Sequence, residues 1–136
     1  MKALIDTNTV LDALASRKPF CADAERIFLL AADERFEGFV TANSITDIYY
    51  LLRKNTSEEV SRDALRNLLQ LFTVVDITGH DCEAALDSPV GDYEYALIAI
   101  CAVNAGVDCI VTRDEAFLQA GLATSIITPT AFLKSF

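Results

Sequence analysis

Val107-Asp108-Cys109-Ile110-Val111-Thr112 is the clearest strand that the sequence predicts, and Arg113-Asp114 follow it directly. The first residues show a similar pattern, Lys2-Ala3-Leu4-Ile5-Asp6, in which a short apolar run ends in a carboxylate. Apolar and β-branched runs of this length between polar residues are typical of buried strands. Two predicted strands near opposite ends of the sequence are therefore each followed by an aspartate.

Strands and helices alternate along the rest of the chain. Strands are predicted at 2–6, 38–41, 72–77, 107–112 and 125–128, and helices at 7–16, 20–33, 43–52, 56–70, 81–86, 92–104, 115–119 and from Pro129 onward. This alternation favours parallel pairing, right-handed crossovers and helices on both faces of the sheet. We therefore expect one domain over residues 1–136, of the α/β class, with three α/β/α layers and a mostly parallel central sheet of about five strands.

The size and composition are typical of one globular domain. The chain has 136 residues, of which 52% are apolar and 23% charged, and these values exclude a disordered or fibrous class. Its four cysteines lie in apolar surroundings, without a C-x-x-C motif or a Cys/His cluster. We interpret them as reduced core thiols, which implies a reducing compartment.

No segment of the sequence indicates a membrane anchor or an export signal. The longest uninterrupted apolar stretch, Tyr95 to Val103, is far shorter than the roughly 20 residues of a membrane span. Asp6 interrupts the N-terminal apolar run before the apolar region of a signal peptide would be complete. We therefore expect a soluble cytoplasmic protein that does not contact a membrane.

The formal net charge of −9 limits the possible partners. Proteins that hold nucleic acid by neutralising phosphates need a basic face, and this composition argues against that class. An acidic chain can still act on a polyanion if metal ions screen a local cluster of carboxylates. It can also bind a basic partner.

Four aspartates are predicted to lie near one edge of the sheet. Asp6 and Asp114 follow parallel strands, Asp47 lies on the helix after the second strand, and Asp92 begins the long apolar helix. In open parallel sheets, ligands bind outside the carboxyl ends of the strands. Carboxylates that converge there repel one another, and a hard cation such as Mg²⁺ or Mn²⁺ relieves the repulsion. Together these residues predict a metal site.

Each residue also has a simpler structural interpretation. Asp92 and Asp114 could cap the helices that follow them, and Asp47 could be a solvated surface residue. Asp6 is harder to explain as a cap, because Thr7 and Asn8 add further polar groups beside a buried strand. We interpret Arg113 as a solvated surface arginine.

Four segments together resemble the motifs of PIN-domain proteins. They are Ile5-Asp6-Thr7-Asn8, the stretch Thr41 to Leu51, Ala96-Leu97-Ile98-Ala99 and Val111-Thr112-Arg113-Asp114. Many bacterial members are VapC-like toxins of toxin–antitoxin pairs, so the resemblance implies a PIN-like fold and a ribonuclease that depends on Mg²⁺ or Mn²⁺. It assigns metal binding and catalysis to Asp6, Asp47, Asp92 and Asp114, with Thr7, Asn8, Thr112 and Glu94 as supporting groups.

The sequence departs from the family pattern at two positions. Asp47 occupies a position that usually holds a glutamate, and its side chain is one methylene shorter. Tyr95 stands directly before Ala96-Leu97, where relatives often carry an aspartate. Asp92 lies one helical turn earlier and Glu94 is adjacent, so either could replace the missing acid. We prefer Asp92.

The resemblance leaves two functions open. The first is an endoribonuclease that acts as the toxin of a toxin–antitoxin system, with RNA as substrate and a small antitoxin as partner. The alternative is a catalytically impaired PIN-like protein that binds nucleic acid or protein, which Tyr95 favours. Family resemblance also implies a possible homodimer.

Overall fold

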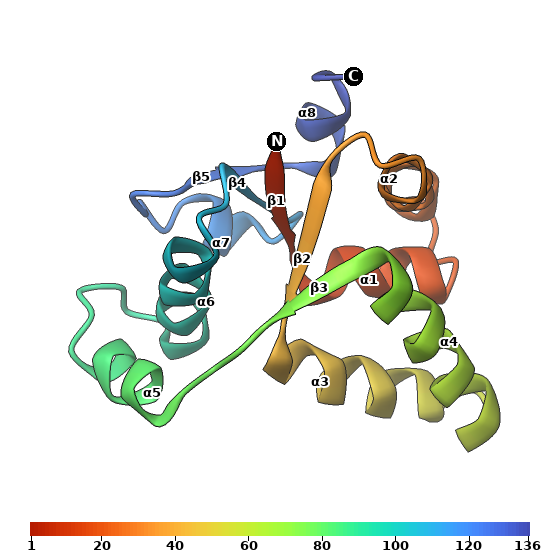
Figure 1. The fold of residues 1–136 in the computed structure, drawn as a ribbon, viewed down its shortest axis with the longest axis horizontal. Helices are drawn as coiled ribbons and strands as arrows, with labels where there is room; N and C mark the ends of the chain where they lie inside the picture. Colours follow the sequence, from red (N-terminus) through yellow and green to blue (C-terminus); the bar gives the residue numbers. More distant parts are fainter.

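Five strands form one parallel sheet at the centre of the computed structural model, which describes residues 1–136 (Figure 1). They are β1 (Lys2–Ile5), β2 (Glu37–Thr41), β3 (Phe72–Val75), β4 (Cys109–Val111) and β5 (Ser125–Ile127). The strand order is β3-β2-β1-β4-β5, and every neighbouring pair is parallel. The predicted α/β fold with a central parallel sheet is confirmed.

The strand order reverses at β1, which pairs with β2 on one side and with β4 on the other. The pairs Ile5–Val111 and Thr41–Val75 bring the carboxyl ends of the strands to one edge. The ladder continues for one more residue beyond β1, where the Asp6 N–H donates to the Val111 carbonyl at 3.0 Å. An open α/β sheet has its ligand crevice at such a reversal.

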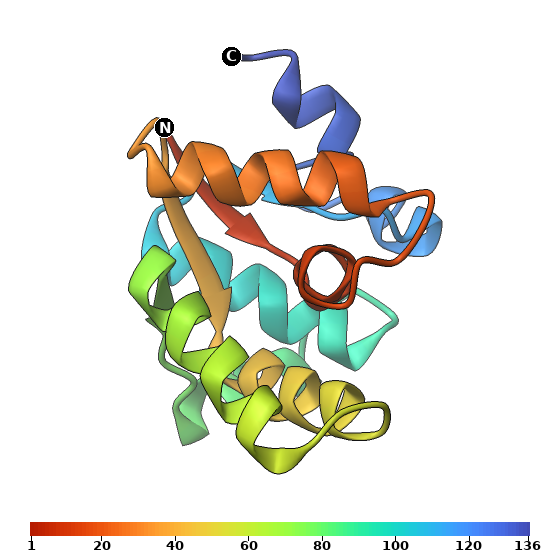
Figure 2. The same ribbon diagram turned by 90° about the vertical axis from the view of Figure 1, so that its right-hand side faces the viewer.

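Helices cover both faces of the sheet, and Figure 2 shows them from the side. The eight helices are α1 (Thr7–Leu14), α2 (Cys21–Ala32), α3 (Ala42–Arg53), α4 (Glu58–Leu71), α5 (Gly79–Leu86), α6 (Tyr93–Ala105), α7 (Glu115–Leu118) and α8 (Pro129–Leu133). The first four and α8 pack on one face, while α6 and α7 pack on the other and α5 packs against α6. The three expected layers are present.

The alternation of side chains along β1 divides the core into two parts. Ala3 and Ile5 point into the larger cluster, together with Ile27 of α2 and Ile48 of α3. Leu4 points to the opposite face and joins the cluster beneath α6 and α7. All three β1 side chains are at most 1% exposed, so the central strand is buried on both faces, as parallel strands require.

Four strands are shorter than the sequence predicts: β1 and β5 each by one residue, and β3 and β4 by more, because the strands that they pair with end or begin first. The predicted strand 72–77 stops at Val75, which pairs with Thr41, and Thr41 is already the N-cap of α3. The predicted strand 107–112 begins at Cys109, which pairs with Ala3. Residue Asp108 instead bonds to Lys2 through its N–H and its carboxylate, both at 2.8 Å.

All four cysteines are free thiols. Cys101 and Cys109 are buried, and desolvation raises the pKa of each to about 11. Cys21 and Cys82 are only half-buried, so they lie at the margin of the core and not within it. None of the helices is both long and apolar enough to span a bilayer.

Candidate functional site

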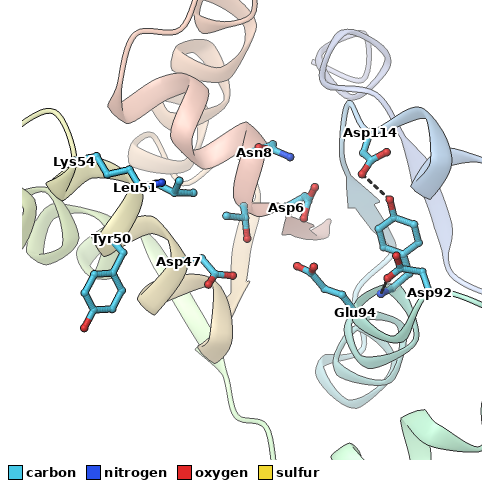
Figure 3. Close-up of a pocket in the computed structure, with 11 residues that line it drawn as sticks. Asp6, Asn8, Asp47, Tyr50, Leu51, Lys54, Asp92, Glu94 and Asp114 are labelled. Atoms are coloured by element: carbon cyan, nitrogen blue, oxygen red, sulfur yellow. Dashed lines mark hydrogen bonds between the residues drawn. The ribbon is translucent and has the colours of Figure 1, made fainter.

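A cleft of about 430 Å³ opens at the carboxyl ends of the strands, where the strand order reverses (Figure 3). Its eleven lining residues are Asp6, Thr7, Asn8, Asp47, Tyr50, Leu51, Lys54, Asp92, Glu94, Tyr95 and Asp114. Five of them carry carboxylates, and Lys54 is the only cation among them. The four aspartates named from the sequence therefore line one cleft, together with Glu94.

Asp6 lies at the N-terminus of α1 but does not cap that helix with its side chain. Its residue is only 8% exposed, and its Oδ2 accepts a hydrogen bond of 2.8 Å from Thr112 Oγ1. Burial raises the pKa of the Asp6 carboxyl, although the Thr112 hydrogen bond acts in the opposite direction. The capping explanation thus does not account for this carboxylate, which lines the cleft.

Asp114 has partners at both carboxylate oxygens. Its Oδ1 accepts from the Ala116 N–H at 3.0 Å, so it caps α7, and its Oδ2 accepts from the Tyr95 hydroxyl at 2.6 Å. The Tyr95 ring stacks on Phe117, with centroids 4.3 Å apart and planes 10° from parallel. Desolvation and the hydrogen bond to Asp114 raise the pKa of the Tyr95 phenol, which therefore remains protonated.

Glu94 occupies the centre of the acidic group. In Figure 3 its side chain extends from α6 into the cleft, and its carboxylate points toward Asp6 and Asp47. Desolvation raises its pKa, and so do the negative charges of Asp6, Asp47, Asp92 and Asp114, in that order. Each of the four predicted aspartates is therefore close enough to Glu94 to affect its ionisation.

Asp92 differs from Glu94 in both position and bonding. It is the N-cap of α6, and its Oδ1 accepts from the Tyr95 N–H at 3.0 Å. In Figure 3 it lies near the backbone of α6, on the far side of Glu94 from Asp47. The structure therefore gives Asp92 the capping role that the sequence offered as its simpler interpretation, and it brings Glu94 closer to the other acids.

Asp47 projects from α3 on the opposite wall of the cleft. The residue is exposed and forms no ion pair with another side chain. The polar groups nearby have defined partners. Thr7 Oγ1 donates to Ser44 Oγ at 2.7 Å, while the Asn8 carbonyl accepts from Arg17 at 2.9 Å. Thr112 Oγ1 accepts from the Asp114 N–H at 3.1 Å and so connects Asp6 to Asp114.

The structure shows an ion-pair network beside the cleft that the sequence did not suggest. Asp12 is 1% exposed, and its carboxylate accepts from Arg17 Nε at 2.8 Å and from Arg113 Nε at 2.6 Å. Arg113 also lies 4.0 Å from the ring centroid of Phe20. The expectation that Arg113 is a solvated surface arginine is therefore wrong. An aspartate inside the apolar stripe of α1 was the available signal.

The donor atoms of the cleft fit a hard divalent cation. Carboxylate oxygens are the ligands that Mg²⁺ and Mn²⁺ prefer. Burial is the main cause of the raised pKa values of Asp6 and Glu94, and the charges of neighbouring aspartates add to both shifts. No three of these side chains are close enough together to hold an ion directly. Because Mg²⁺ usually retains several waters, some carboxylates would bind it through water.

The sequence and fold were compared with known proteins. A family model described as PIN domain matches residues 2–116. VapC20 of Mycobacterium tuberculosis, described as a sarcin-ricin loop cleaving toxin, superposes with a TM-score of 0.70 at 16% identity, covering 90% of this chain and 97% of that chain. A toxin–antitoxin complex from Klebsiella pneumoniae superposes with a TM-score of 0.68 at 20% identity, covering 93% of this chain and 97% of that chain. DNA-bound VapBC from Salmonella typhimurium superposes with a TM-score of 0.67 at 18% identity, covering 95% of this chain and 98% of that chain.

These three superpositions show a shared fold. No curated protein matches the sequence.

Proposed function

We propose that this chain, which belongs to the PIN-domain family, is a metal-dependent endoribonuclease that hydrolyses RNA phosphodiester bonds. The observation that carries the proposal is the cleft at the reversal of strand order, with five carboxylates and one cation. The mutual repulsion of these carboxylates opposes folding, and a bound cation would relieve it. Such clusters of like charge are found most often at functional sites. A divalent cation is the ligand that its oxygen atoms fit best.

Asp6, Asp47 and Asp114 are the proposed metal-binding residues, with Asp92 or Glu94 as the third acid of the family pattern. Glu94 is supported by its carboxylate, which points toward Asp6 and Asp47 in Figure 3, and by the effect of their charges on its pKa. A bound Mg²⁺ or Mn²⁺ would polarise a phosphoryl oxygen and lower the pKa of a coordinated water. Thr112 would hold Asp6 and the Asp114 backbone in register, because it bonds to both.

Lys54 is the proposed contact for the substrate backbone. It is the only cation that lines the cleft and it forms no ion pair. A phosphate that approaches five carboxylates is repelled, and an unpaired ammonium on the wall of the cleft offsets part of this repulsion. Thr7 and Asn8 lie on the same cleft as supporting polar groups.

We further propose that the protein is the toxin of a toxin–antitoxin pair in the cytoplasm. Support comes from the likeness of its fold to toxins of this kind, among them proteins solved in toxin–antitoxin complexes. With a net charge of −9, the chain would suit an antitoxin that places a basic side chain among the carboxylates. A homodimer remains an expectation from the family.

One observation favours the second candidate, a catalytically impaired PIN-like binding module. Tyr95 replaces an acid, and its hydroxyl bonds to Asp114, whose other oxygen caps α7. Asp114 is therefore less free to bind a cation than Asp6 is. The retained carboxylates and the unpaired Lys54 favour the enzyme.

The test is cleavage of labelled structured and single-stranded RNAs in Mn²⁺, in Mg²⁺ and in EDTA. We expect metal-dependent cleavage by the wild type and none by Asp6→Asn. Asp76→Asn is the matched control, because Asp76 follows β3 at the same sheet edge, is exposed and does not line the cleft.

Mn²⁺ titration by calorimetry accompanies this assay. The absence of both cleavage and Mn²⁺ binding would favour the binding module. Metal binding without cleavage would support the metal site and call for a wider set of RNA substrates.

A further inference from the structure

We propose that Tyr95 is a positioning residue for the acidic site: its hydroxyl fixes the Asp114 carboxylate in the orientation in which it takes part in binding a divalent cation. The inference rests on the proposed function. It assigns a role to the residue that otherwise counts only as a missing acid. The observations that carry it are the hydrogen bond of 2.6 Å and the way the ring is held.

The Tyr95 ring is held by contacts other than its hydrogen bond to Asp114. It stacks on Phe117, which is fully buried, and the Tyr95 N–H donates to Asp92 at the N-terminus of α6. These contacts fix the position of the phenol oxygen, which donates to Asp114 at the N-terminus of α7. A hydroxyl held in this way selects one orientation of the carboxylate that accepts from it.

Asp114 is held from three directions as a result. Tyr95 donates to its Oδ2, the Ala116 N–H donates to its Oδ1, and its own N–H donates to Thr112 Oγ1 at 3.1 Å. The same Thr112 hydroxyl donates to Asp6 Oδ2. Tyr95 thus completes a continuous set of hydrogen bonds that runs from α6 through Asp114 to Asp6. A carboxylate keeps further lone pairs after accepting these bonds.

A phenol also suits the charge of this cleft better than another acid would. Five carboxylates already line it, and that of Glu94, the neighbour of Tyr95, already points toward Asp6 and Asp47. A sixth carboxylate would add to the repulsion, whereas a neutral donor reduces the charge density on Asp114. In this proposal Glu94 provides the third acid of the site, and Tyr95 provides the hydrogen bond that orients Asp114.

The competing explanation is that Tyr95 merely blocks Asp114 or leaves an acid missing. Three variants distinguish the two explanations. Tyr95→Phe keeps the ring on Phe117 and removes only the hydroxyl. Tyr95→Asp restores the acid of the family pattern. Tyr93→Phe is the matched control, since Tyr93 lies on the same helix, its hydroxyl bonds to the Cys82 carbonyl at 2.9 Å, and it does not line the cleft.

The experiment is calorimetric Mn²⁺ titration of the metal-free wild type and each variant, with Tm measured in parallel. We expect Tyr95→Phe to weaken Mn²⁺ binding by about tenfold or more, the usual effect of losing a hydrogen bond to a metal ligand, with little change in Tm. Tyr93→Phe should bind as the wild type does.

Two results would overturn the inference in distinguishable ways. Unchanged or tighter Mn²⁺ binding by Tyr95→Phe, with tighter binding by Tyr95→Asp, would show that Tyr95 only replaces an acid, and the proposed nuclease would stand. If the wild type bound no Mn²⁺, the inference and the proposed metal dependence would both fail.

Discussion

At the scale of single residues, the identity of the third acid decides how the site works. Asp92 and Glu94 both line the cleft, but Asp92 caps α6 whereas the Glu94 carboxylate points toward Asp6 and Asp47. Their substitutions can be matched closely. Asparagine is as good an N-cap as aspartate, so Asp92→Asn removes charge and keeps the cap. Glu94→Gln removes charge at nearly constant shape.

We predict that Glu94→Gln weakens Mn²⁺ binding and RNA cleavage by about tenfold or more, while Asp92→Asn changes either by only a few-fold. The reason is that Glu94 faces the other acids and Asp92 is engaged with the backbone of its own helix. Calorimetry and initial cleavage rates measure the two effects. If Asp92→Asn had the larger effect, Asp92 and not Glu94 would be the third acid of the site.

The sequence predicts which acids gather but not how Glu94 and Asp92 divide their roles. A helix over 92–104 places Asp92 one turn before Tyr95 on the same face. In the structure α6 begins at Tyr93, and Asp92 has extended backbone angles, φ −87° and ψ 121°. The helical phase therefore does not extend to Asp92. A difference of one residue in the start of a helix, which sequence patterns do not resolve, changes which of the two acids points toward Asp6 and Asp47.

Other parts of the site depend on contacts between distant segments. The pairing of Asp12 with Arg113, and of Tyr95 with Asp114, joins residues 101 and 19 positions apart. No local pattern specifies such pairs. Asp6 and Asp114 could be placed from the sequence because Asp6 follows β1 directly and Asp114 follows β4 within three residues, and parallel strands end at the same edge.

At the scale of elements, α3 presents a mixed stripe to the cleft. Asp47, Tyr50, Leu51 and Lys54 follow one another at helical spacing and all line it. Seven residues from Asp47 to Lys54 correspond to about 10 Å along the helix axis. The helix thus carries an acid at its inner end, an exposed aromatic ring in the middle and a cation at its outer end.

We predict that Lys54→Ala weakens RNA binding several-fold. The slope of log affinity against log salt concentration should fall in magnitude by about 1, as expected for the loss of one phosphate contact. Arg53→Ala is the control, because Arg53 is the neighbouring exposed cation and does not line the cleft. Binding is measured at several salt concentrations with the Asp6→Asn background, so that no cleavage intervenes. Equal effects of the two substitutions would indicate only a general charge effect.

At the scale of the whole molecule, the acidic cleft opposes folding at neutral pH. The pKa of Glu94 is raised by desolvation and then by the charges of Asp6, Asp47, Asp92 and Asp114. For an acid whose pKa is higher in the folded state, the contribution to stability is present below the unfolded pKa. It is lost as pH rises through the folded pKa. The ionised Glu94 therefore lowers the free energy of unfolding at pH 7.

We predict that Glu94→Gln raises the Tm of the metal-free protein at pH 7. The difference from wild type should shrink as pH falls through the raised pKa of Glu94, because the wild-type carboxyl then becomes neutral too. Mn²⁺ should raise the Tm of the wild type more than that of the variant. Thermal melts over a pH series, with and without Mn²⁺, measure all three effects. A variant less stable than wild type at pH 7 would contradict the argument.

The central position of β1 has a consequence for protein synthesis. Asp6 emerges from the ribosome well before its hydrogen-bond partner Thr112, which lies 106 positions later. Until β4 has been made, β1 has a partner on one side only, and Asp114 has no fixed place near Asp6. A nascent or prematurely released chain that lacks β4 therefore contains Asp6 and Asp47 but not the complete acidic cleft. Any nuclease activity would begin only after β4 and Asp114 have been synthesised.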